Sequence, residues 1–273
     1  MGAALALLGS NSPHVRNEIL SSPPGDPARV KPRPHRIETG RRFWIWVALG
    51  FVATLATGMI YAQYIIQAKG WTQGLPWELT LLRIIHRPLP SAIDLFVLFL
   101  PWLGTNITIL PGIALASWYL NKHARRDLIV CLIVAAAGNY VVGFLLKFVY
   151  DRPRPHLWPG RGEYTGPSYP SGHAMMATSV LFVVAYLLRR ERGWQWPYVA
   201  AIIFGLLTIY SRLYLGVHWP TDVFSGTVLG AIWLATLLRA MDAHNDELFE
   251  FRARRPGDRR FHARAEEQPR RVS

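Results

Sequence analysis

The sequence predicts an all-α, polytopic membrane protein, a bundle of six transmembrane helices between two flexible cytoplasmic tails. Three observations lead to this prediction. Of the 273 residues, 51% are apolar and only 17% are charged, which is too apolar for an ordinary soluble domain of this size. Long windows without a charged residue recur along the chain, and the positive charges are distributed unevenly between the segments that join them.

Six uncharged windows mark the predicted crossings. They cover residues 43–66, 95–120, 128–146, 174–188, 194–211 and 223–238. An α-helix needs about 20 residues to cross a bilayer, so the fourth and sixth windows are long enough only if the polar residues before them form a first helical turn. Pro101, Gly104 and Pro111 interrupt the second window, because proline removes a backbone hydrogen bond and glycine weakens a helix.

The distribution of lysine and arginine orients the predicted bundle. With a cytoplasmic N-terminus, 22 of the 30 lysine and arginine residues fall in the tails and the inner connections. Positive charge gathers on the cytoplasmic side of membrane proteins, so both termini are expected in the cytoplasm. The same rule accounts for the net charge of +13 without a nucleic-acid partner. The short loops are typical of a bacterial protein, so the expected location is a bacterial inner membrane.

The sequence is predicted to divide into three segments. They are a basic tail at 1–42, a membrane domain at 43–240 and a charged tail at 241–273. The tails lack apolar periodicity, so we expect them to be flexible. Residues 67–94 place Trp71 and Trp77 among scattered charges, which suits a segment at the outer membrane interface. Cys131, the single cysteine, lies in the third window and is expected to be a small buried apolar residue.

The first candidate motif lies at the end of the third crossing. Eight basic residues fall on the predicted outer side, and five of them lie between this point and the end of the fifth crossing. Lysine and arginine normally gather on the cytoplasmic side, so these outward-facing basic residues need another explanation. An anionic ligand on the outer face explains them best. Lys147 lies about one turn before the run ends, and Arg152 and Arg154 precede prolines, which favours extended backbone. A lysine that reaches the interface beside a basic loop is the alternative.

The second motif, Tyr-Pro-Ser-Gly-His at residues 169–173, directly precedes the fourth run. Ser171 is suited to be the N-cap of a helix and Gly172 keeps its start compact, so free backbone N–H groups would point outward. A helix start of this kind binds phosphate, and His173 would lie in its first turn. A cap beside an interfacial histidine is the alternative.

The third motif, SRLYLGVHWPTD at residues 211–222, joins the last two crossings. Arg212 lies where the fifth helix emerges, and Pro220 suits the first position of the sixth. If helical geometry extends back to His218, Asp222 lies on the same face and accepts a hydrogen bond from Nδ1–H, which leaves Nε2 unprotonated. A metal-ligand pair or a capping aspartate beside a surface histidine is the alternative, although no further ligands occur at useful spacings.

Together, the three motifs resemble the signature of the type 2 phosphatidic acid phosphatase superfamily. The correspondence is K-x6-RP at Lys147, Arg154 and Pro155, PSGH at residues 170–173, and SR-x5-H-x3-D at Ser211, Arg212, His218 and Asp222. The resemblance covers about residues 43–240. It implies a six-helix phosphatase with its site on the extracytoplasmic side and with no metal or cofactor. It also implies a lipid phosphate substrate such as phosphatidic acid, phosphatidylglycerophosphate or undecaprenyl pyrophosphate.

The resemblance also assigns roles to the site residues. The phosphate clamp would consist of Lys147, Arg154, Arg212 and the N–H groups around Ser171 and Gly172, with Arg152 as a further member. His218 would attack phosphorus and form a phosphohistidine, with Asp222 orienting it. His173 would donate a proton to the leaving group and then assist hydrolysis of the intermediate.

Three other functions are compatible with parts of the pattern. A lipid phosphotransferase would use the same histidine but pass the phosphoryl group to another lipid. A transporter would place its polar residues near mid-membrane in broken helices, whereas here they gather at helix ends. A vanadium haloperoxidase resembles the signature but is soluble. The expected partners are the lipid phosphate substrate and the surrounding membrane lipids, and the sequence leaves the oligomeric state open.

Overall fold

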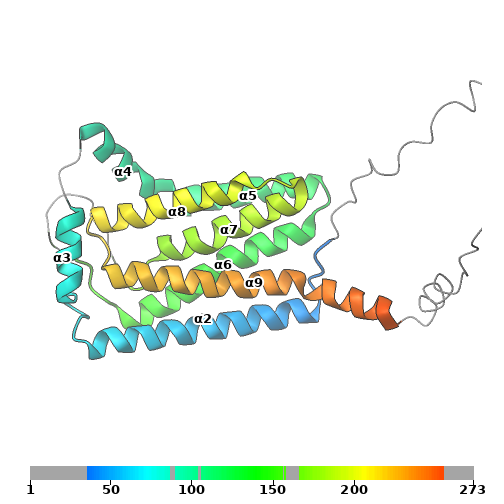
Figure 1. Ribbon diagram of the computed structural model, residues 1–273, viewed down its shortest axis with the longest axis horizontal. Helices are drawn as coiled ribbons and strands as arrows, with labels where there is room; N and C mark the ends of the chain where they lie inside the picture. The colour runs from blue at the N-terminus through cyan, green and yellow to red at the C-terminus, as the bar shows by residue number, and fades with distance from the viewer. Residues whose placement is uncertain (1–35, 87–89, 104–105, 156, 158–165, 255–273) are drawn as a thin grey trace, which may run out of the picture. The chain divides into compact units, whose positions relative to one another are not determined.

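The computed structural model describes residues 36–86, 90–103, 106–155, 157 and 166–254. The chain divides into two compact units, Met1–His35 and Arg36–Ser273, and every described residue belongs to the second. Within these residues the structure contains eight α-helices (Figure 1). They are α2 (Arg41–Gln67), α3 (Pro76–Ile85), α4 (Ser91–Leu103), α5 (Asn106–Lys122), α6 (Arg126–Tyr150), α7 (Gly172–Arg192), α8 (Trp196–Tyr214) and α9 (Pro220–Arg254).

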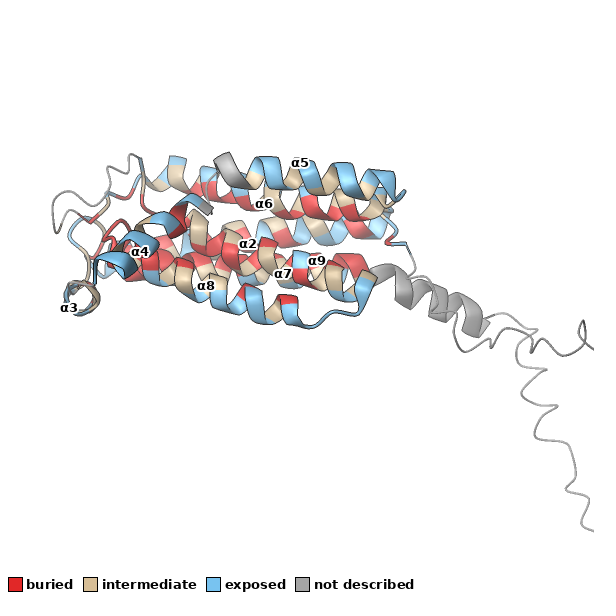
Figure 2. Ribbon diagram, turned by 90° about the horizontal axis from the view of Figure 1, so that it is seen from above, coloured by how far each residue is buried: buried red, intermediate tan, exposed pale blue. Residues whose placement is uncertain are grey.

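Five of these helices are long and apolar enough to cross a membrane. They are α2, α6, α7, α8 and residues Pro220–Asp242 of α9. Four of the six predicted windows lie inside these helices, and the fifth, 194–211, begins two residues before α8. The chain is therefore a polytopic all-α membrane protein. Helix α9 packs against α2 and α7, and α7 also packs against α6 and α8. Buried positions face one another inside this group of helices, whereas large parts of the outer faces are exposed (Figure 2).

The second predicted window differs from the structure, which divides it into two helices. Helix α4 ends at Leu103, α5 begins at Asn106, and the two residues between them lie outside the described part. Pro101 lacks the N–H that would continue the hydrogen-bond ladder, and Gly104 follows it. Helix α4 packs against α8, and α5 packs against α6, so the two halves of the window have different neighbours.

Helix α3 forms within the segment that the sequence places at an interface. Pro76 stands at its first position, and the backbone N–H of Leu75 donates a 2.7 Å hydrogen bond to Oε2 of Glu78. A proline start and a glutamate at the third position are standard features of a helix N-terminus. The Glu78 side chain is nevertheless fully buried, so it faces the protein.

The predicted tails are only partly described. Residues 1–35 and 255–273 lie outside the described residues. Helix α9 continues to Arg254, past residue 241, where the second predicted tail begins. Residues 241–254 contain neither glycine nor proline, and Pro256 follows them, so the helix stops where a proline disfavours it.

Small residues allow α9 to approach α7 closely at the end that carries the site. A Cβ atom on Gly226 would lie 2.5 Å from the carbonyl oxygen of Ser171, and one on Gly230 would lie 2.7 Å from that of Met175. The two glycines are four residues apart, so they share a helix face. This close contact holds the second and third turns of α9 against the first turn of α7.

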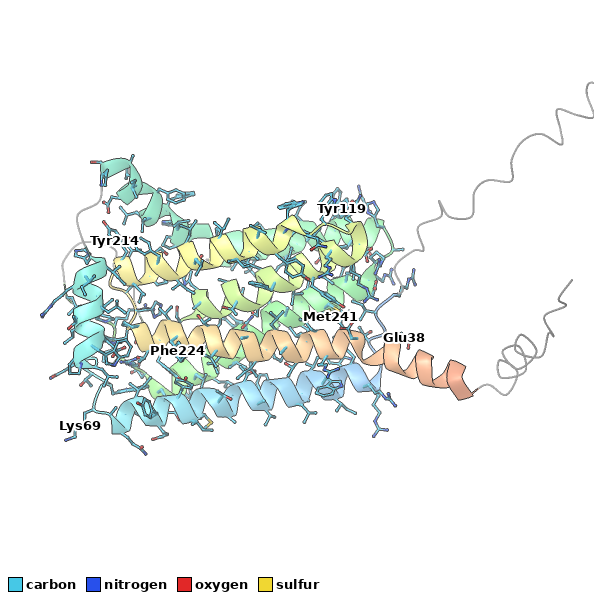
Figure 3. All side chains as sticks on the ribbon, in the orientation of Figure 1. Glu38, Lys69, Tyr119, Tyr214, Phe224 and Met241 are labelled. Carbon is cyan, nitrogen blue, oxygen red and sulfur yellow. The ribbon has the colours of Figure 1, made fainter. Side chains whose placement is uncertain are left out.

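The two ends of the bundle can be located from labelled side chains (Figure 3). Lys69 and Tyr214 lie near α3, whereas Glu38, Tyr119 and Met241 lie at the opposite end. Helix α6 ends, α7 begins, α8 ends and α9 begins at the α3 end. The three sequence motifs therefore meet at one end of the bundle.

Candidate active site

A cavity of about 790 Å³ lies between α5, α6, the start of α7, the end of α8 and the turn before α9. Six of the lining residues come from the three motifs. They are Lys147, Arg154, Gly172, His173, Arg212 and His218. The rest of the lining is mostly apolar and comes from α5 and α6, with Ile109, Ile113, Ala136 and Phe144 among its members. The cavity thus has a cationic end and an apolar extension between helices.

Two cations of the cavity are fixed by the backbone of neighbouring loops. Lys147 Nζ donates a 2.6 Å hydrogen bond to the carbonyl of Pro167. Arg154 donates to the carbonyls of Gly166 at 3.0 Å, Pro167 at 3.2 Å and Val217 at 2.7 Å. These bonds to carbonyl groups hold the cations in place without neutralising their charge.

Arg212 supplies the third cation. It lies in the last turn of α8, and its side chain is fully buried. The positive charge of a guanidinium in such an environment is costly unless an anion accompanies it. Three cationic side chains around one cavity therefore make it a site suited to a multiply charged anion.

His218 lies between these cations and the protein interior. Its side chain is almost entirely buried, and Nε2 lies 3.3 Å from Nη1 of Arg154. Burial holds the pKa of His218 well below its ordinary value, and Arg154, Lys147, Arg212 and His173 lower this pKa further. The imidazole is therefore neutral at physiological pH, which leaves one ring nitrogen with a lone pair.

Asp222 lies behind His218, but it does not hold the imidazole in the predicted way. Helix α9 begins at Pro220, so His218 precedes the helix. His218 Nδ1 and Asp222 Oδ2 are 3.5 Å apart, which is longer than a hydrogen bond. Instead, Oδ2 accepts a 2.9 Å hydrogen bond from the backbone N–H of Trp219. His218 and Asp222 are therefore neighbours, as expected, but the carboxylate is hydrogen-bonded to the turn that carries the histidine and not to the imidazole.

Helix α7 begins at the cavity, as its motif predicts. Ser171 is the N-cap residue, but its hydroxyl makes no capping bond, and its backbone N–H donates to the carbonyl of Asp222 at 3.0 Å. Gly172 is open on its Cβ side. His173 lines the cavity, and its Nε2 atom is buried with no hydrogen-bond partner in the structure. The first N–H groups of the helix and an imidazole nitrogen are thus available to an anion.

Arg152 has a different position from the one predicted. It is fully buried, does not line the cavity, and donates from Nη1 to Asp222 Oδ1 at 2.7 Å. Its remaining bonds are to Thr221 and to the carbonyls of Gly70 and Trp71. The expectation that Arg152 extends the phosphate clamp is therefore corrected, since its guanidinium faces the buried carboxylates behind the site.

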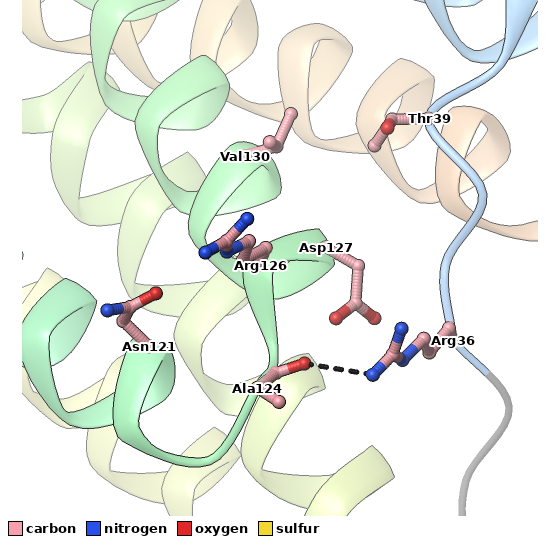
Figure 4. A pocket seen from close by; sticks show the side chains of 7 residues that line it. All are labelled: Arg36, Thr39, Asn121, Ala124, Arg126, Asp127 and Val130. Atoms are coloured by element: carbon pink, nitrogen blue, oxygen red, sulfur yellow. Dashed lines mark hydrogen bonds between the residues drawn. The ribbon is translucent and has the colours of Figure 1, made fainter.

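A second cavity, of about 490 Å³, lies at the other end of α6. It is lined by Arg36, Asn121, Arg126 and Asp127 among others, and Arg36 donates a 3.3 Å hydrogen bond to the carbonyl of Ala124 (Figure 4). Asp127 accepts hydrogen bonds from the backbone N–H of Ile37 and from Arg125. These contacts attach the segment before α2 to the start of α6, so the polar groups of this cavity have a structural role. The first cavity, which contains residues of all three motifs, is therefore the better candidate for an active site.

No group of three or more histidine, cysteine, aspartate or glutamate side chains is placed to hold a metal ion within the described ranges. The positive charge at the first cavity is that of lysine and arginine side chains. Cys131 is fully buried in α6, as predicted, and it does not line the first cavity.

Comparison with known proteins identifies the family. Residues 128–246 match the PAP2 superfamily, and this range contains all nine predicted site residues. The chain is 28% identical to an undecaprenyl-diphosphatase of Sulfolobus acidocaldarius, over 72% of this chain and 90% of the relative. It is 31% identical to phosphatidylglycerophosphatase B of Bacillus subtilis, over 51% of this chain and 70% of the relative.

A solved structure shares the fold. It is a transmembrane PAP2-type phosphatidylglycerolphosphate phosphatase from Bacillus subtilis, with a TM-score of 0.58, 21% identity and coverage of 76% of this chain and 98% of that one. The sequence matches, the shared fold and the convergence of the three motifs agree. The chain belongs to the PAP2 superfamily of membrane lipid phosphatases.

Proposed function

We propose that the protein hydrolyses a lipid phosphate monoester or pyrophosphate through a phosphohistidine on His218. One observation carries this proposal: Lys147, Arg154 and Arg212 surround the same cavity as His173, His218 and the start of α7. Phosphoryl transfer depends on positioning and on stabilising charge on the phosphoryl oxygens. Fixed cations and backbone N–H groups can supply both.

The geometry supports an in-line displacement. The phosphate accepts hydrogen bonds from the three cations and from the N–H groups of the first turn of α7. Nε2 of His218 is the nitrogen nearest to Arg154, and its lone pair attacks phosphorus. The new N–P bond forms as the bond from phosphorus to the leaving oxygen breaks, and His173 donates a proton to that oxygen. Water, deprotonated by His173, then attacks phosphorus and releases inorganic phosphate and neutral His218.

The cavity also supports a lipid substrate. Its apolar extension runs along α5 and α6, past Ile113, Ala136 and Phe144, where an acyl or prenyl chain would find a matching surface. The names of the relatives point to undecaprenyl diphosphate and phosphatidylglycerophosphate. We propose one of these, or phosphatidic acid, as the substrate.

The membrane arrangement that we propose has six crossings. Helices α4 and α5 together would supply the sixth, beside the five helices that are long enough by themselves. The excess of lysine and arginine at the end opposite α3 favours cytoplasmic tails around a membrane domain at 43–240. The cavity would then face the extracytoplasmic side, where the headgroup of a lipid in the outer leaflet reaches it.

A substrate panel tests the proposal. Purified protein in detergent or proteoliposomes is incubated with phosphatidic acid, phosphatidylglycerophosphate and undecaprenyl pyrophosphate in the presence of EDTA. We expect release of inorganic phosphate from at least one lipid, and we expect His218→Asn to abolish it while the protein remains monodisperse. Absence of release across the panel would count against a phosphatase, and a newly phosphorylated lipid in place of free phosphate would indicate a phosphotransferase.

A further inference from the structure

A buried polar network lies on the side of His218 that faces away from the cavity. It joins Glu78 of α3, Arg152 after α6, and Thr221 and Asp222 in the first turn of α9. Glu78, Arg152 and Asp222 are fully buried, and Thr221 is nearly so. Buried charges are costly unless they are paired and hydrogen-bonded, so this arrangement needs an explanation that the phosphate clamp does not supply.

Glu78 is bound to α9 as well as to its own helix. Its Oε1 accepts a 2.9 Å hydrogen bond from the backbone N–H of Thr221 and a 2.7 Å hydrogen bond from the Thr221 hydroxyl. Its Oε2 accepts the 2.7 Å bond from Leu75 and lies 3.6 Å from Nη2 of Arg152. The carboxylate thus fixes the start of α9 relative to α3.

The direction of these hydrogen bonds follows from the chemistry of the groups. A guanidinium only donates, and a hydroxyl has a single hydrogen. Arg152 Nη1 donates at 2.7 Å both to Thr221 Oγ1 and to Asp222 Oδ1. The Thr221 hydroxyl must therefore give its hydrogen to Glu78. The chain of donors runs from Arg152 through Thr221 to Glu78, and it is complete only when Glu78 offers an acceptor at this position.

We propose that Glu78 is a positioning residue of the phosphatase site, acting through Thr221 and Arg152 on Asp222 and thereby on His218. This inference rests on the proposed function. Arg152 and Trp219 hold the two oxygens of the Asp222 carboxylate. Because Glu78 fixes Thr221 and faces Arg152, it determines where that carboxylate lies behind the histidine.

The network also has an electrostatic effect on the site. The two carboxylates of Glu78 and Asp222 face the single guanidinium of Arg152, so acidic groups outnumber basic groups in this buried layer. From the cavity side, His218 faces Lys147, Arg154, Arg212 and His173. The imidazole becomes positively charged as its bond to phosphorus forms, and negative charge behind it favours that step.

Two substitutions test the positioning role. Thr221→Val keeps the shape of the side chain but removes the hydroxyl, and Thr221→Ser restores the hydroxyl. Glu78→Gln keeps the size of the side chain but removes its charge. It also puts an amide NH₂, a donor, in place of one of the two carboxylate oxygens, both of which accept hydrogen bonds from Thr221 or Leu75. The controls are Thr80→Val, at an exposed threonine of α3, and Glu191→Gln, at a glutamate paired with Arg125 on another part of the bundle.

We expect Thr221→Val and Glu78→Gln to lower kcat by about 10- to 100-fold with little change in KM, because a small misplacement of a reacting group has an effect of this size. Thr221→Ser and both controls should stay close to wild type. Glu78→Gln removes negative charge near His218, so the pKa of His218 falls and the acid limb of the pH profile moves to lower pH. Thr221→Val leaves the charges unchanged and should leave that limb in place.

The outcomes separate this inference from the proposed function. Wild-type phosphate release that His218→Asn abolishes is measured first, on the same lipid, and its absence would count against the phosphatase. Wild-type kcat in both Glu78→Gln and Thr221→Val would overturn the positioning role alone. The same loss of kcat in Thr221→Ser as in Thr221→Val would also overturn it, because the hydroxyl would then have no special part. Thermal unfolding in detergent shows that each variant is folded.

Discussion

Arg154 provides the most discriminating test of the charge arrangement at the cavity, because it can be changed in charge and in shape separately. Arg154→Lys keeps the positive charge but loses the planar fork that binds a phosphate through two parallel hydrogen bonds. Arg154→Gln loses the charge as well. The Arg154 Nη1 atom lies 3.3 Å from Nε2 of His218, so it is adjacent to the proposed nucleophile and to any phosphate bound there.

The magnitude follows from the hydrogen bonds that each variant loses. A hydrogen bond to a charged group contributes about 1.5–3 kcal/mol, and about 1.4 kcal/mol changes a rate tenfold. Arg154→Lys, with one such bond lost, should lower kcat/KM by about 10- to 100-fold. Arg154→Gln, with two lost, should lower it by about 10²- to 10⁴-fold. Arg83→Gln, the same change at an exposed arginine of α3, should have no effect.

The pH profile gives an independent readout of the same change. Burial is the largest cause of the lowered pKa of His218, and Arg154 is the next. Removing this cation raises the pKa, so the imidazole becomes protonated and inactive at a higher pH. The acid limb of kcat/KM should therefore move to higher pH in Arg154→Gln and stay in place in Arg154→Lys. Folded Arg154→Gln protein with an unmoved acid limb and near wild-type kcat/KM would refute this reasoning.

Two further predictions concern the support of the site. Asp222→Asn places an amide NH₂ against either the Trp219 N–H or Arg152, both of which are donors. The substitution should therefore lower kcat by about 10²- to 10⁴-fold. Unchanged phosphate release by the folded variant would contradict the role of Asp222. Gly226→Ala puts a Cβ atom 2.5 Å from the Ser171 carbonyl oxygen and should destabilise the protein by about 1–3 kcal/mol, as measured by unfolding in detergent. Gly112→Ala, with nothing within 4 Å of its Cβ, should not destabilise it, and equal stability of both variants would argue against the close packing of α7 and α9.

Much of the site could be predicted from sequence because its residues occupy helix ends. Lys147 ends one apolar run, His173 begins another, and Arg212 ends a third. In a bundle with short connections these ends alternate between the two sides, so spacing alone places the three motifs on the same side. The cavity has all three residues in its lining.

Other parts could not be predicted, because identical local signals lead to different environments. Arg152 and Arg154 both precede a proline, but only Arg154 lines the cavity, while Arg152 is buried against Asp222. Glu78 lies in a segment whose tryptophans and scattered charges indicate an interface, and its burial depends on how α3 packs against α9. The capping pattern of Pro76 and Glu78 indicates a helix start, and it gives no sign of the bond to Thr221.

The beginnings and ends of the helices also could not be fully predicted from the sequence. An uncharged run from 95 to 120 is long enough for a crossing, and apolarity alone does not reveal that α4 packs against α8 while α5 packs against α6. His218 lies four residues before Asp222, which suits one helix face, but Pro220 starts α9 after the histidine. The distance of 3.5 Å between the two side chains is a result of the turn, which the spacing does not specify.

The central claim, that His218 is the nucleophile, is tested most directly by trapping the intermediate. Wild-type protein is mixed with a lipid phosphate labelled with ³²P, quenched with base during turnover, and digested for mass spectrometry. Phosphohistidine is stable in base and labile in acid, so we predict a base-stable, acid-labile label on His218 that is absent from His218→Asn and reduced in Arg154→Gln. Label on another residue, or turnover by wild-type protein with the label never appearing on His218, would contradict the account.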